Sequence, residues 1–344
     1  MVAFAGNAGE WVSFNKNGRG GLFSKLKRLG LKIMNRHDVN WTGYIPAVTT
    51  PFTRDGELDL PSLAVMMEWY VEQRMHGVVL AGTSGEWFSL SEGERAELFL
   101  EAGRAIDKRI TVLGGCNAYS AKEAIVHAKA AARAGLDGIL LTPPPYIVPT
   151  RREIVQFYKD VSDATDMPIC AYNWPRGCVV DMDEDLIDEI ADIDKVVAIK
   201  NSTPDIGAFL RGAYRVRDKI RYFNLPPNEL GADLAMLKVA DGSMGAGAVL
   251  GSDHPDFFRC AVAGNKADAL RLARRDQMMM QDWVSKDFAG KFGNLQAILK
   301  TALRFRGLPA GYVRKPLLEL SSMEIETVRQ TLEKLGIDIV PIEP

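Results

Sequence analysis

Residues 196–203, VVAIKNST, place a single lysine at the end of an apolar, β-branched run. The run Val196–Ile199 predicts a strand that is buried on both faces, as in a parallel sheet covered by helices. Lysine is rarely buried without a partner. Burial disfavours the ammonium form and lowers its pKa, and the neutral amine can then attack a ketone or aldehyde to form a Schiff base. Lys200 is therefore the first candidate for chemistry.

Other polar residues follow other apolar runs. GTSG at 82–85 comes after the run at 77–82, Tyr146 ends TPPPY, and Tyr172 begins YNWPRG. Tyrosine and threonine hydroxyls can pass protons to a reacting group. GTSG can offer backbone N–H groups and hydroxyls to a carboxylate just ahead of a helix. The candidate set from these runs is Gly82, Thr83, Ser84, Tyr146, Tyr172 and Lys200.

Each candidate also has a purely structural interpretation. Lys200 can extend into solvent or pair with a carboxylate. Tyr172 can be a core aromatic with a satisfied hydroxyl. GTSG can be an ordinary turn and TPPPY a stiff loop. Their common place after predicted strands favours chemistry, because catalytic groups of a β/α barrel gather at the carboxyl ends of its strands.

The elements that would carry these residues alternate regularly from Tyr44 onward. Eight strand–helix units over about 220 residues are close to the ~250 residues of a (β/α)8 barrel. S-x-x-E pairs at Ser91 and Ser120 predict helix starts, and GSMGAGAVLG at 242–251 is expected to form the eighth strand. A doubly wound open sheet is the main alternative, but no G-x-G-x-x-G turn follows the first strand.

Three regions are expected along the chain. Residues 41–264 form the barrel and residues 265–344 a small helical C-terminal region. Residues 1–40 are a basic, glycine-interrupted extension, in which 22–34 could form an amphipathic helix. The interpretations of this extension are a targeting peptide, an anchor to an anionic surface, or an interface arm or disordered extension.

Composition excludes several classes of function. A formal net charge of −2 gives no overall attraction to nucleic acid or to an anionic membrane, and no apolar stretch approaches the ~20 residues of a membrane span. The four cysteines and four histidines are scattered without metal-ligand spacing. We therefore expect a cytoplasmic protein that uses neither a metal nor an organic cofactor.

These motifs resemble the dihydrodipicolinate synthase / N-acetylneuraminate lyase family of class I, Schiff-base-forming aldolases. The resemblance runs from Tyr44 to about Gly336. It rests on GTSGE at 82–86, on Tyr172, Asn173 and Pro175, and on AIKNST at 198–203. It implies a (β/α)8 TIM barrel with a helical tail and a lyase that acts on pyruvate or a related 2-oxo acid.

The resemblance also implies roles for individual residues. Lys200 would form the imine, Tyr172 would transfer protons beside it, and Thr83 would belong to a hydroxyl relay. Thr83 and Ser84, with Gly82 beside them, would hold the substrate carboxylate.

Further residues would act at the edges of this site. Tyr146 would be lent to a neighbouring subunit, which implies a homodimer or homotetramer. Val249 would line the pocket beside the imine.

Departures from the family pattern bear on the substrate. Gly177 stands where lysine-pathway synthases carry an arginine for a second substrate, and Arg176 lies one residue earlier. Trp174 replaces a small apolar residue, and FNLPPNE at 223–229 differs from the family's glycine followed by acidic residues. Trp174 and Arg176 are therefore candidate specificity residues. GEWFSLS at 85–91 resembles the acid-sugar dehydratase branch.

We therefore expect aldol cleavage or condensation of a 2-oxo acid, or dehydration of a keto-deoxy sugar acid. The alternatives are dihydrodipicolinate synthase activity proper and a non-catalytic 2-oxo-acid-binding regulatory protein on the same scaffold. A phosphate-binding barrel enzyme using GSMGAG at 242–247 is a further alternative.

Overall fold

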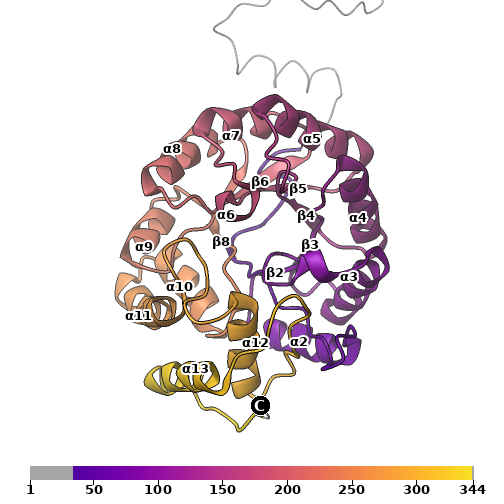
Figure 1. Cartoon of the computed structure of the whole chain (residues 1–344). Coiled ribbons are helices and arrows are strands. Elements are labelled where there is room, and N and C mark those ends of the chain that lie inside the picture. The colour runs from indigo at the N-terminus through magenta and orange to yellow at the C-terminus, as the bar shows by residue number, and fades with distance from the viewer. Residues whose placement is uncertain (1–33, 343–344) are drawn as a thin grey trace, which may run out of the picture. The chain divides into compact units, whose positions relative to one another are not determined.

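Eight parallel strands form a barrel in the computed structural model, which describes residues 34–342 (Figure 1). Each strand pairs with the next along the chain from β2 to β8, and β8 pairs with β1. Ala47, just beyond β1, bridges to Val79 of β2 and to Ala246 beyond β8, which closes the ring. The strands are β1 (Gly43–Tyr44), β2 (Gly77–Leu80), β3 (Thr111–Gly115), β4 (Gly138–Leu141), β5 (Ile169–Asn173), β6 (Val196–Asn201), β7 (Arg221–Phe223) and β8 (Gly242–Ser243).

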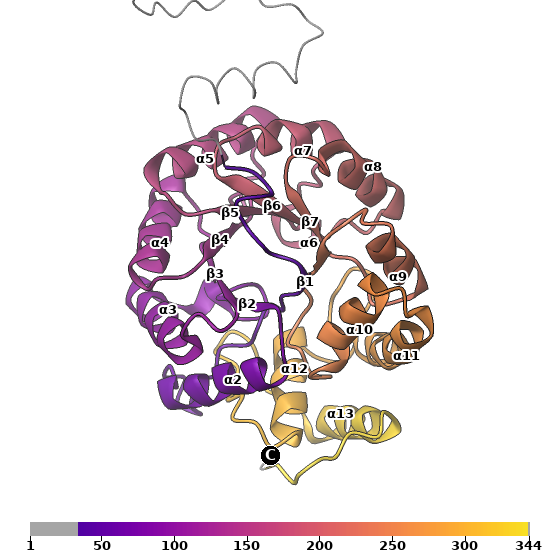
Figure 2. The same ribbon diagram turned by 180° about the vertical axis from the view of Figure 1, so that it is seen from behind.

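Helices alternate with these strands and surround them, as Figures 1 and 2 show from opposite sides. The predicted (β/α)8 barrel is thereby confirmed. The helices of the ring are α2 (Leu60–Glu72), α3 (Glu92–Ile106), α4 (Ala121–Arg133), α5 (Arg151–Ala164), α7 (Glu184–Ala191), α8 (Ile206–Val216), α9 (Glu229–Met236) and α10 (Asp253–Val262). Two short helices, η1 (Trp87–Ser89) and α6 (Pro175–Cys178), were not predicted.

The predicted helix starts are found where the S-x-x-E pairs lie. Ser91 and Glu94 form a complete capping box at α3. At α4 the Ser120 hydroxyl accepts the Glu123 N–H, but the Glu123 carboxylate accepts the N–H of Tyr119. Each cap satisfies backbone N–H groups that lack partners inside the helix.

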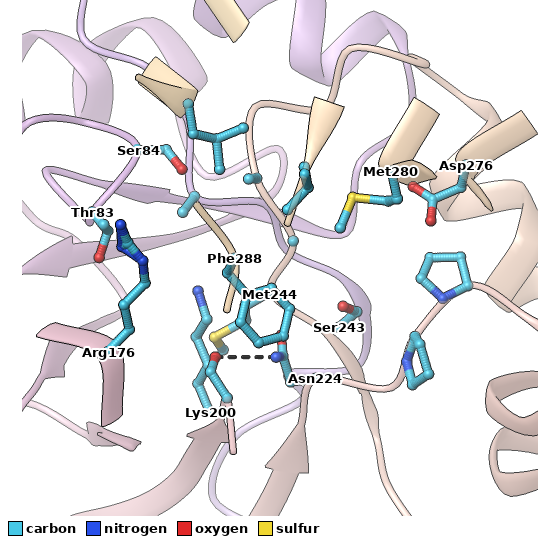
Figure 3. A pocket seen from close by; sticks show the side chains of 18 of the residues that line it. Thr83, Ser84, Arg176, Lys200, Asn224, Ser243, Met244, Asp276, Met280 and Phe288 are labelled. Carbon is cyan, nitrogen blue, oxygen red and sulfur yellow. Dashed lines mark hydrogen bonds between the residues drawn. The ribbon is translucent and has the colours of Figure 1, made fainter. Parts of the chain in front are cut away.

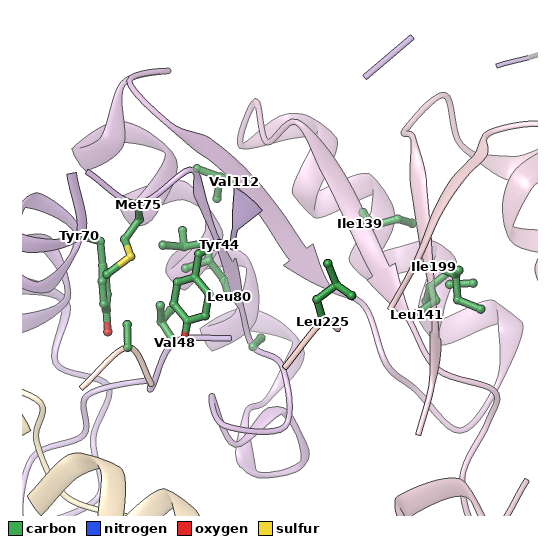
Figure 4. Packing of buried hydrophobic residues seen from close by; sticks show 14 of the residues in the cluster. Tyr44, Val48, Tyr70, Met75, Leu80, Val112, Ile139, Leu141, Ile199 and Leu225 are labelled. Carbon is green, nitrogen blue, oxygen red and sulfur yellow. The ribbon is translucent and has the colours of Figure 1, made fainter. Parts of the chain in front are cut away.

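The core has two parts, one inside the barrel and one between strands and helices. Along β6, Val197 and Ala198 belong to the inner cluster, and Val196 and Ile199 to the outer one. Figure 4 shows part of the outer cluster, including Tyr70. Because both faces of each strand are buried, the strands lack an alternating polar pattern.

Residues 34–40, predicted as the end of the N-terminal extension, lie on the amino-terminal end of the barrel. The Met34 N–H donates to Asp194, and the Arg36 guanidinium pairs with Asp241 at 2.9 Å. Arg221 donates to the carbonyls of Arg36 and Val39. The unit that contains the barrel therefore begins at Met34, and residues 1–33 of the predicted extension lie outside the described residues.

The C-terminal region is helical, with α11 (Lys266–Trp283), α12 (Leu295–Phe305) and α13 (Ser322–Lys334). In both views α12 lies beside α2 and brings the C-terminal region against the barrel. Almost every side chain of α12 is buried. In residues 34–342, no helix combines the length and the apolar character that crossing a membrane requires.

The eighth strand is shorter than the predicted 242–251 segment, because β8 ends at Ser243. Gly247, Ala248 and Gly251 have φ values of +66°, +56° and +58°. Left-handed backbone cannot continue an extended strand. This turn moves Val249 away from the strand position that the sequence suggested.

Candidate active site

Lys200 and Tyr172 lie side by side at the carboxyl ends of β6 and β5. The parallel register pairs the two residues directly, and the Lys200 Nζ lies 4.4 Å from the centroid of the Tyr172 ring. Only 7% of Lys200 and 2% of Tyr172 are exposed. Figure 3 shows the Lys200 side chain extending into the pocket.

Burial makes the Lys200 amine easier to deprotonate. It lowers the pKa of Lys200 from 10.5 to about 8, and the charge of a Cys170 thiolate would oppose this. Burial raises the pKa of the Cys170 thiol to about 12, so this opposing charge is almost absent at neutral pH. A pKa lowered by more than two units increases the neutral fraction of the amine by more than about a hundredfold at pH 7. The site thus holds an amine that can act as a nucleophile.

Tyr172 is held as a protonated phenol. Burial raises its pKa, while hydrogen bonds with the Ser202 and Thr83 side chains act in the opposite direction. The phenol therefore stays neutral at pH 7 and can exchange protons with a neighbouring hydroxyl. The structure brings the predicted Thr83 and Tyr172 together. Ser202 was not predicted, although its position two residues after Lys200 on the same strand end was a usable signal.

Thr83 and Ser84 lie in a loop that the C-terminal region fixes in place. The Gln296 amide on α12 donates to the Thr83 carbonyl at 3.0 Å. The Thr50 hydroxyl donates to the Gly85 carbonyl at 2.8 Å. Two anchors thus constrain the backbone beside the predicted carboxylate-binding hydroxyls.

The same loop ends in a buried ion pair. Glu86, with φ of +55°, binds Lys300 of α12, and the two residues are 0% and 1% exposed. The second carboxylate oxygen of Glu86 accepts the Arg314 N–H at 2.9 Å. Burial lowers the pKa of Lys300 to about 8, although Glu86 opposes the shift. The Lys300 ammonium is therefore paired with a carboxylate, whereas the Lys200 amine faces the cavity.

A cavity of about 470 Å³ opens above these residues. Six of the residues predicted for the site line it, namely Thr83, Ser84, Tyr172, Trp174, Arg176 and Lys200. Gly82 does not line the cavity, and its carbonyl accepts the Gly85 N–H at 3.1 Å within the loop. Tyr146, at φ +76° in the loop after β4, is 89% exposed and lies outside the cavity of this single chain.

Val249 also lies outside this lining, which corrects the expectation that it borders the imine. It is fully buried in the outer core, and its carbonyl accepts a hydrogen bond from Arg306. The residues of this region that border the cavity are Ser243, Met244, Gly245 and Ala246.

Three aromatic residues that line the cavity, Tyr172, Trp174 and Phe288, contact one another in sequence. The Trp174 ring stacks on Tyr172 with centroids 5.7 Å apart, and it lies 6.0 Å from the Phe288 ring. Phe288 belongs to the loop between α11 and α12, and Asp287 beside it pairs with Arg176 at 3.5 Å. This loop therefore covers one side of the cavity.

Gly177 is explained by the packing of Trp174. A Cβ atom at Gly177 would lie 2.5 Å from the Trp174 indole, far inside van der Waals contact. A side chain at position 177 and this orientation of Trp174 therefore exclude one another. The Trp174 ring thus occupies the space that the first side-chain atoms of an arginine at position 177 would need.

Asparagines on β5 and β6 stabilise the strand ends beneath the cavity. The Asn173 amide donates to Asn201 at 2.8 Å and to Asp181 at 2.7 Å, and Asn201 donates to Tyr222. Asn173 was noted from the YNWPRG motif, but Asn201 was not predicted. Within residues 34–342, no group of three or more His, Cys, Asp or Glu side chains is arranged to hold a metal ion.

Comparison with known proteins gives one consistent family. A profile of the Dihydrodipicolinate synthetase family matches residues 40–335. An uncharacterized DapA-like lyase of Rhizobium meliloti is 30% identical over 310 residues, which cover 86% of this chain and 96% of that protein. The 4-hydroxy-tetrahydrodipicolinate synthase of Pseudoalteromonas atlantica is 30% identical over 303 residues, covering 86% and 99%.

The fold also matches that of a solved dihydrodipicolinate synthase. The chloride-inhibited dihydrodipicolinate synthase of Acinetobacter baumannii, solved in complex with pyruvate, superposes with a TM-score of 0.78 at 30% identity. That match covers 86% of this chain and 99% of the other.

Proposed function

This chain belongs to the dihydrodipicolinate synthetase family, and from that premise we propose that it forms a Schiff base between Lys200 and pyruvate or a related 2-oxo acid. The observation that carries the proposal is the environment of Lys200. Its buried amine faces the cavity, has a pKa of about 8, and lies 4.4 Å from the centroid of the Tyr172 ring. The pyruvate complex of the Acinetobacter baumannii relative supports the choice of substrate class.

The chemistry follows from a neutral amine beside a phenol. The Lys200 nitrogen adds to the carbonyl carbon, and the resulting carbinolamine loses water to give the imine. The protonated imine accepts electrons when a proton leaves the adjacent carbon, which gives an enamine. That enamine can add to an aldehyde, as in aldol condensation, or expel a β-hydroxyl group as water after protonation. The reverse of the addition is aldol cleavage.

The surrounding residues would support these steps. Tyr172 would pass protons to and from the carbinolamine oxygen, and Thr83 and Ser202 would continue the relay. Thr83 and Ser84 would hold the substrate carboxylate. Tyr146 is a large, exposed aromatic residue on the rim, and we propose that it completes the relay of a neighbouring subunit in a homo-oligomer. No cofactor is required, because the imine itself provides the electron sink.

The reaction we favour is aldol cleavage or condensation, or dehydration of a keto-deoxy sugar acid. 4-Hydroxy-tetrahydrodipicolinate synthase activity is the second candidate, and the names of the relatives support it. The packing of the Trp174 indole against Gly177 argues against synthase activity, because it leaves no space at position 177 for the arginine that would bind the second substrate.

A turnover panel tests the proposal. Purified enzyme is incubated with a set of 2-oxo acids, with and without aldehydes, and with keto-deoxy sugar acids. Cleavage, condensation and dehydration products are then measured. We expect turnover of at least one compound and a loss of about 10³-fold or more in Lys200→Ala. Turnover that survives in Lys200→Ala would contradict the proposal.

A further inference from the structure

The cavity continues past Lys200 to a second polar wall. That wall is formed by Tyr44 of β1, Ser243 of β8, His254 of α10, and Asp276 and Gln277 of α11. In Figure 3, Asp276 lies with Met280 on the side of the pocket away from Thr83 and Arg176. Among the described residues that line the cavity, Asp276 is its one carboxylate, while Arg176 and Lys200 supply cations at the other end.

His254 fixes the hydrogen-bonding state of Asp276. The His254 ring is 3% exposed, stacks on Tyr44 with centroids 4.4 Å apart, and places Nε2 2.8 Å from the Asp276 Oδ1. Its Nδ1 is buried without a partner among the described residues. An ionised carboxylate oxygen can only accept a hydrogen bond, so the ring nitrogen that faces it at 2.8 Å must be the donor. Nε2 accordingly carries the proton and donates to Asp276, which acts as an acceptor.

Asp276 keeps unused acceptor capacity toward the cavity. The residue is 8% exposed, and the bond from His254 engages only Oδ1. Asp276 borders the cavity, and among the described residues the hydrogen bond given for its carboxylate is the one from His254 to Oδ1. An ionised carboxylate offers about four acceptor positions, and buried carboxylates are normally well satisfied by donors. A ligand with hydrogen-bond donors at this end of the cavity would fill the acceptor positions of Asp276 that the protein leaves open.

We infer that the Asp276 end of the cavity is a subsite for hydroxyl groups on the substrate's tail, so that the substrate is a hydroxylated 2-oxo acid longer than pyruvate. This inference rests on the proposed function, because Lys200 must hold the other end of the same molecule. The cavity volume of about 470 Å³ lies within the ~300–1,000 Å³ of pockets that enclose molecules much larger than a three-carbon acid.

The neighbours of Asp276 favour hydroxyls over an ammonium group. Ser243 and Gln277 are neutral and can both donate and accept hydrogen bonds, as hydroxyl groups do. Met279, Met280 and Trp283 on the same helix provide apolar surface for the carbon chain. An ammonium would leave most of its charge facing this apolar surface, which is costly.

The test compares two six-carbon 2-oxo acids on the wild-type enzyme. Imine formation is trapped with borohydride and quantified by mass spectrometry at increasing concentrations of 2-keto-3-deoxygluconate or 2-oxohexanoate. The first compound has hydroxyl groups along its tail and the second has none. We expect 2-keto-3-deoxygluconate to half-saturate trapping at a concentration at least tenfold lower. Equal or reversed concentrations would overturn the inference.

Variants then assign the effect to Asp276. Asp276→Asn should lose at least fivefold of the preference for 2-keto-3-deoxygluconate, while trapping by pyruvate changes less than twofold. Asp282→Asn is the matched control, because Asp282 lies on the same helix and accepts the Thr331 hydroxyl outside the cavity. An equal change for both compounds would contradict the subsite. Absence of trapping by any 2-oxo acid in the wild type would instead contradict the proposed function, so the two failures are distinct.

Discussion

The buried carboxylate of Glu86 binds the ammonium of Lys300 and thereby joins the GTSGE loop to helix α12. The two residues are 214 positions apart in the chain. The ion pair fixes the end of the loop that carries Thr83 and Ser84, which lie three and two residues before Glu86. The helical region thus holds the loop with the proposed carboxylate-binding residues in position.

Breaking this pair should destabilise the protein and weaken carboxylate binding. Lys300→Met leaves the Glu86 carboxylate buried without its cation, and such changes cost about 3–5 kcal/mol. Urea unfolding measures the loss. The double variant Glu86→Gln/Lys300→Met removes both charges and should recover part of the lost free energy of unfolding. A single variant as stable as the wild type would show that the pair contributes nothing.

Replacing the buried Lys200 should stabilise the fold at neutral pH. Its folded-state pKa of about 8 lies below the ordinary 10.5, so the native state disfavours the charged amine. The corresponding destabilisation is on the order of 3 kcal/mol below pH 8 and disappears as pH rises from 8 to about 10.5. Lys200→Met should therefore raise the free energy of unfolding at pH 7 and lose this advantage by pH 10.5.

The measurement is urea unfolding of both proteins across this pH range. Lys300→Met serves as the contrast, because Lys300 has a similarly lowered pKa but a carboxylate partner. Destabilisation by Lys200→Met at pH 7 would contradict the prediction, because it would mean that the folded state stabilises the charged amine.

Tyr172→Phe should slow proton transfer without removing the nucleophile. General acid–base catalysis contributes about 10²–10⁴-fold, so kcat should fall by this factor while a borohydride-trapped adduct still forms on Lys200. Steady-state kinetics and adduct mapping on the same sample separate the two effects. Unchanged kcat would remove Tyr172 from the proposed relay.

Gly177→Ala should displace the Trp174 ring, since the new Cβ would lie 2.5 Å from it. Such overpacking costs about 1–3 kcal/mol. Trp174→Ala makes room, so the double variant should be more stable than the sum of the two single effects predicts. Thermal unfolding of the four proteins gives the coupling free energy. Strict additivity would show that the two positions do not compete for space.

Periodicity and strand-end position were enough to predict the barrel and to place Lys200 beside Tyr172. Lys200 and Tyr172 could be placed because each directly ends an apolar run, and parallel strands bring such ends together. Val249 was misplaced because the left-handed turn around Ala248 has no strong signal in a glycine-rich segment. The role of Lys300 was also missed, since a helix in the C-terminal region carries no hint that it contacts a loop 214 residues away. The packing of Gly177 against Trp174 depends on the orientation of the indole ring, which no local sequence pattern specifies.

Borohydride reduction in the presence of pyruvate, followed by peptide mass mapping, tests the central claim most directly. We expect one pyruvate-derived adduct per chain, on the peptide that carries Lys200. The peptide that carries Lys300 should stay unmodified, although both lysines have pKa values of about 8. An adduct on Lys300, on surface lysines alone, or on no lysine at all would contradict the account.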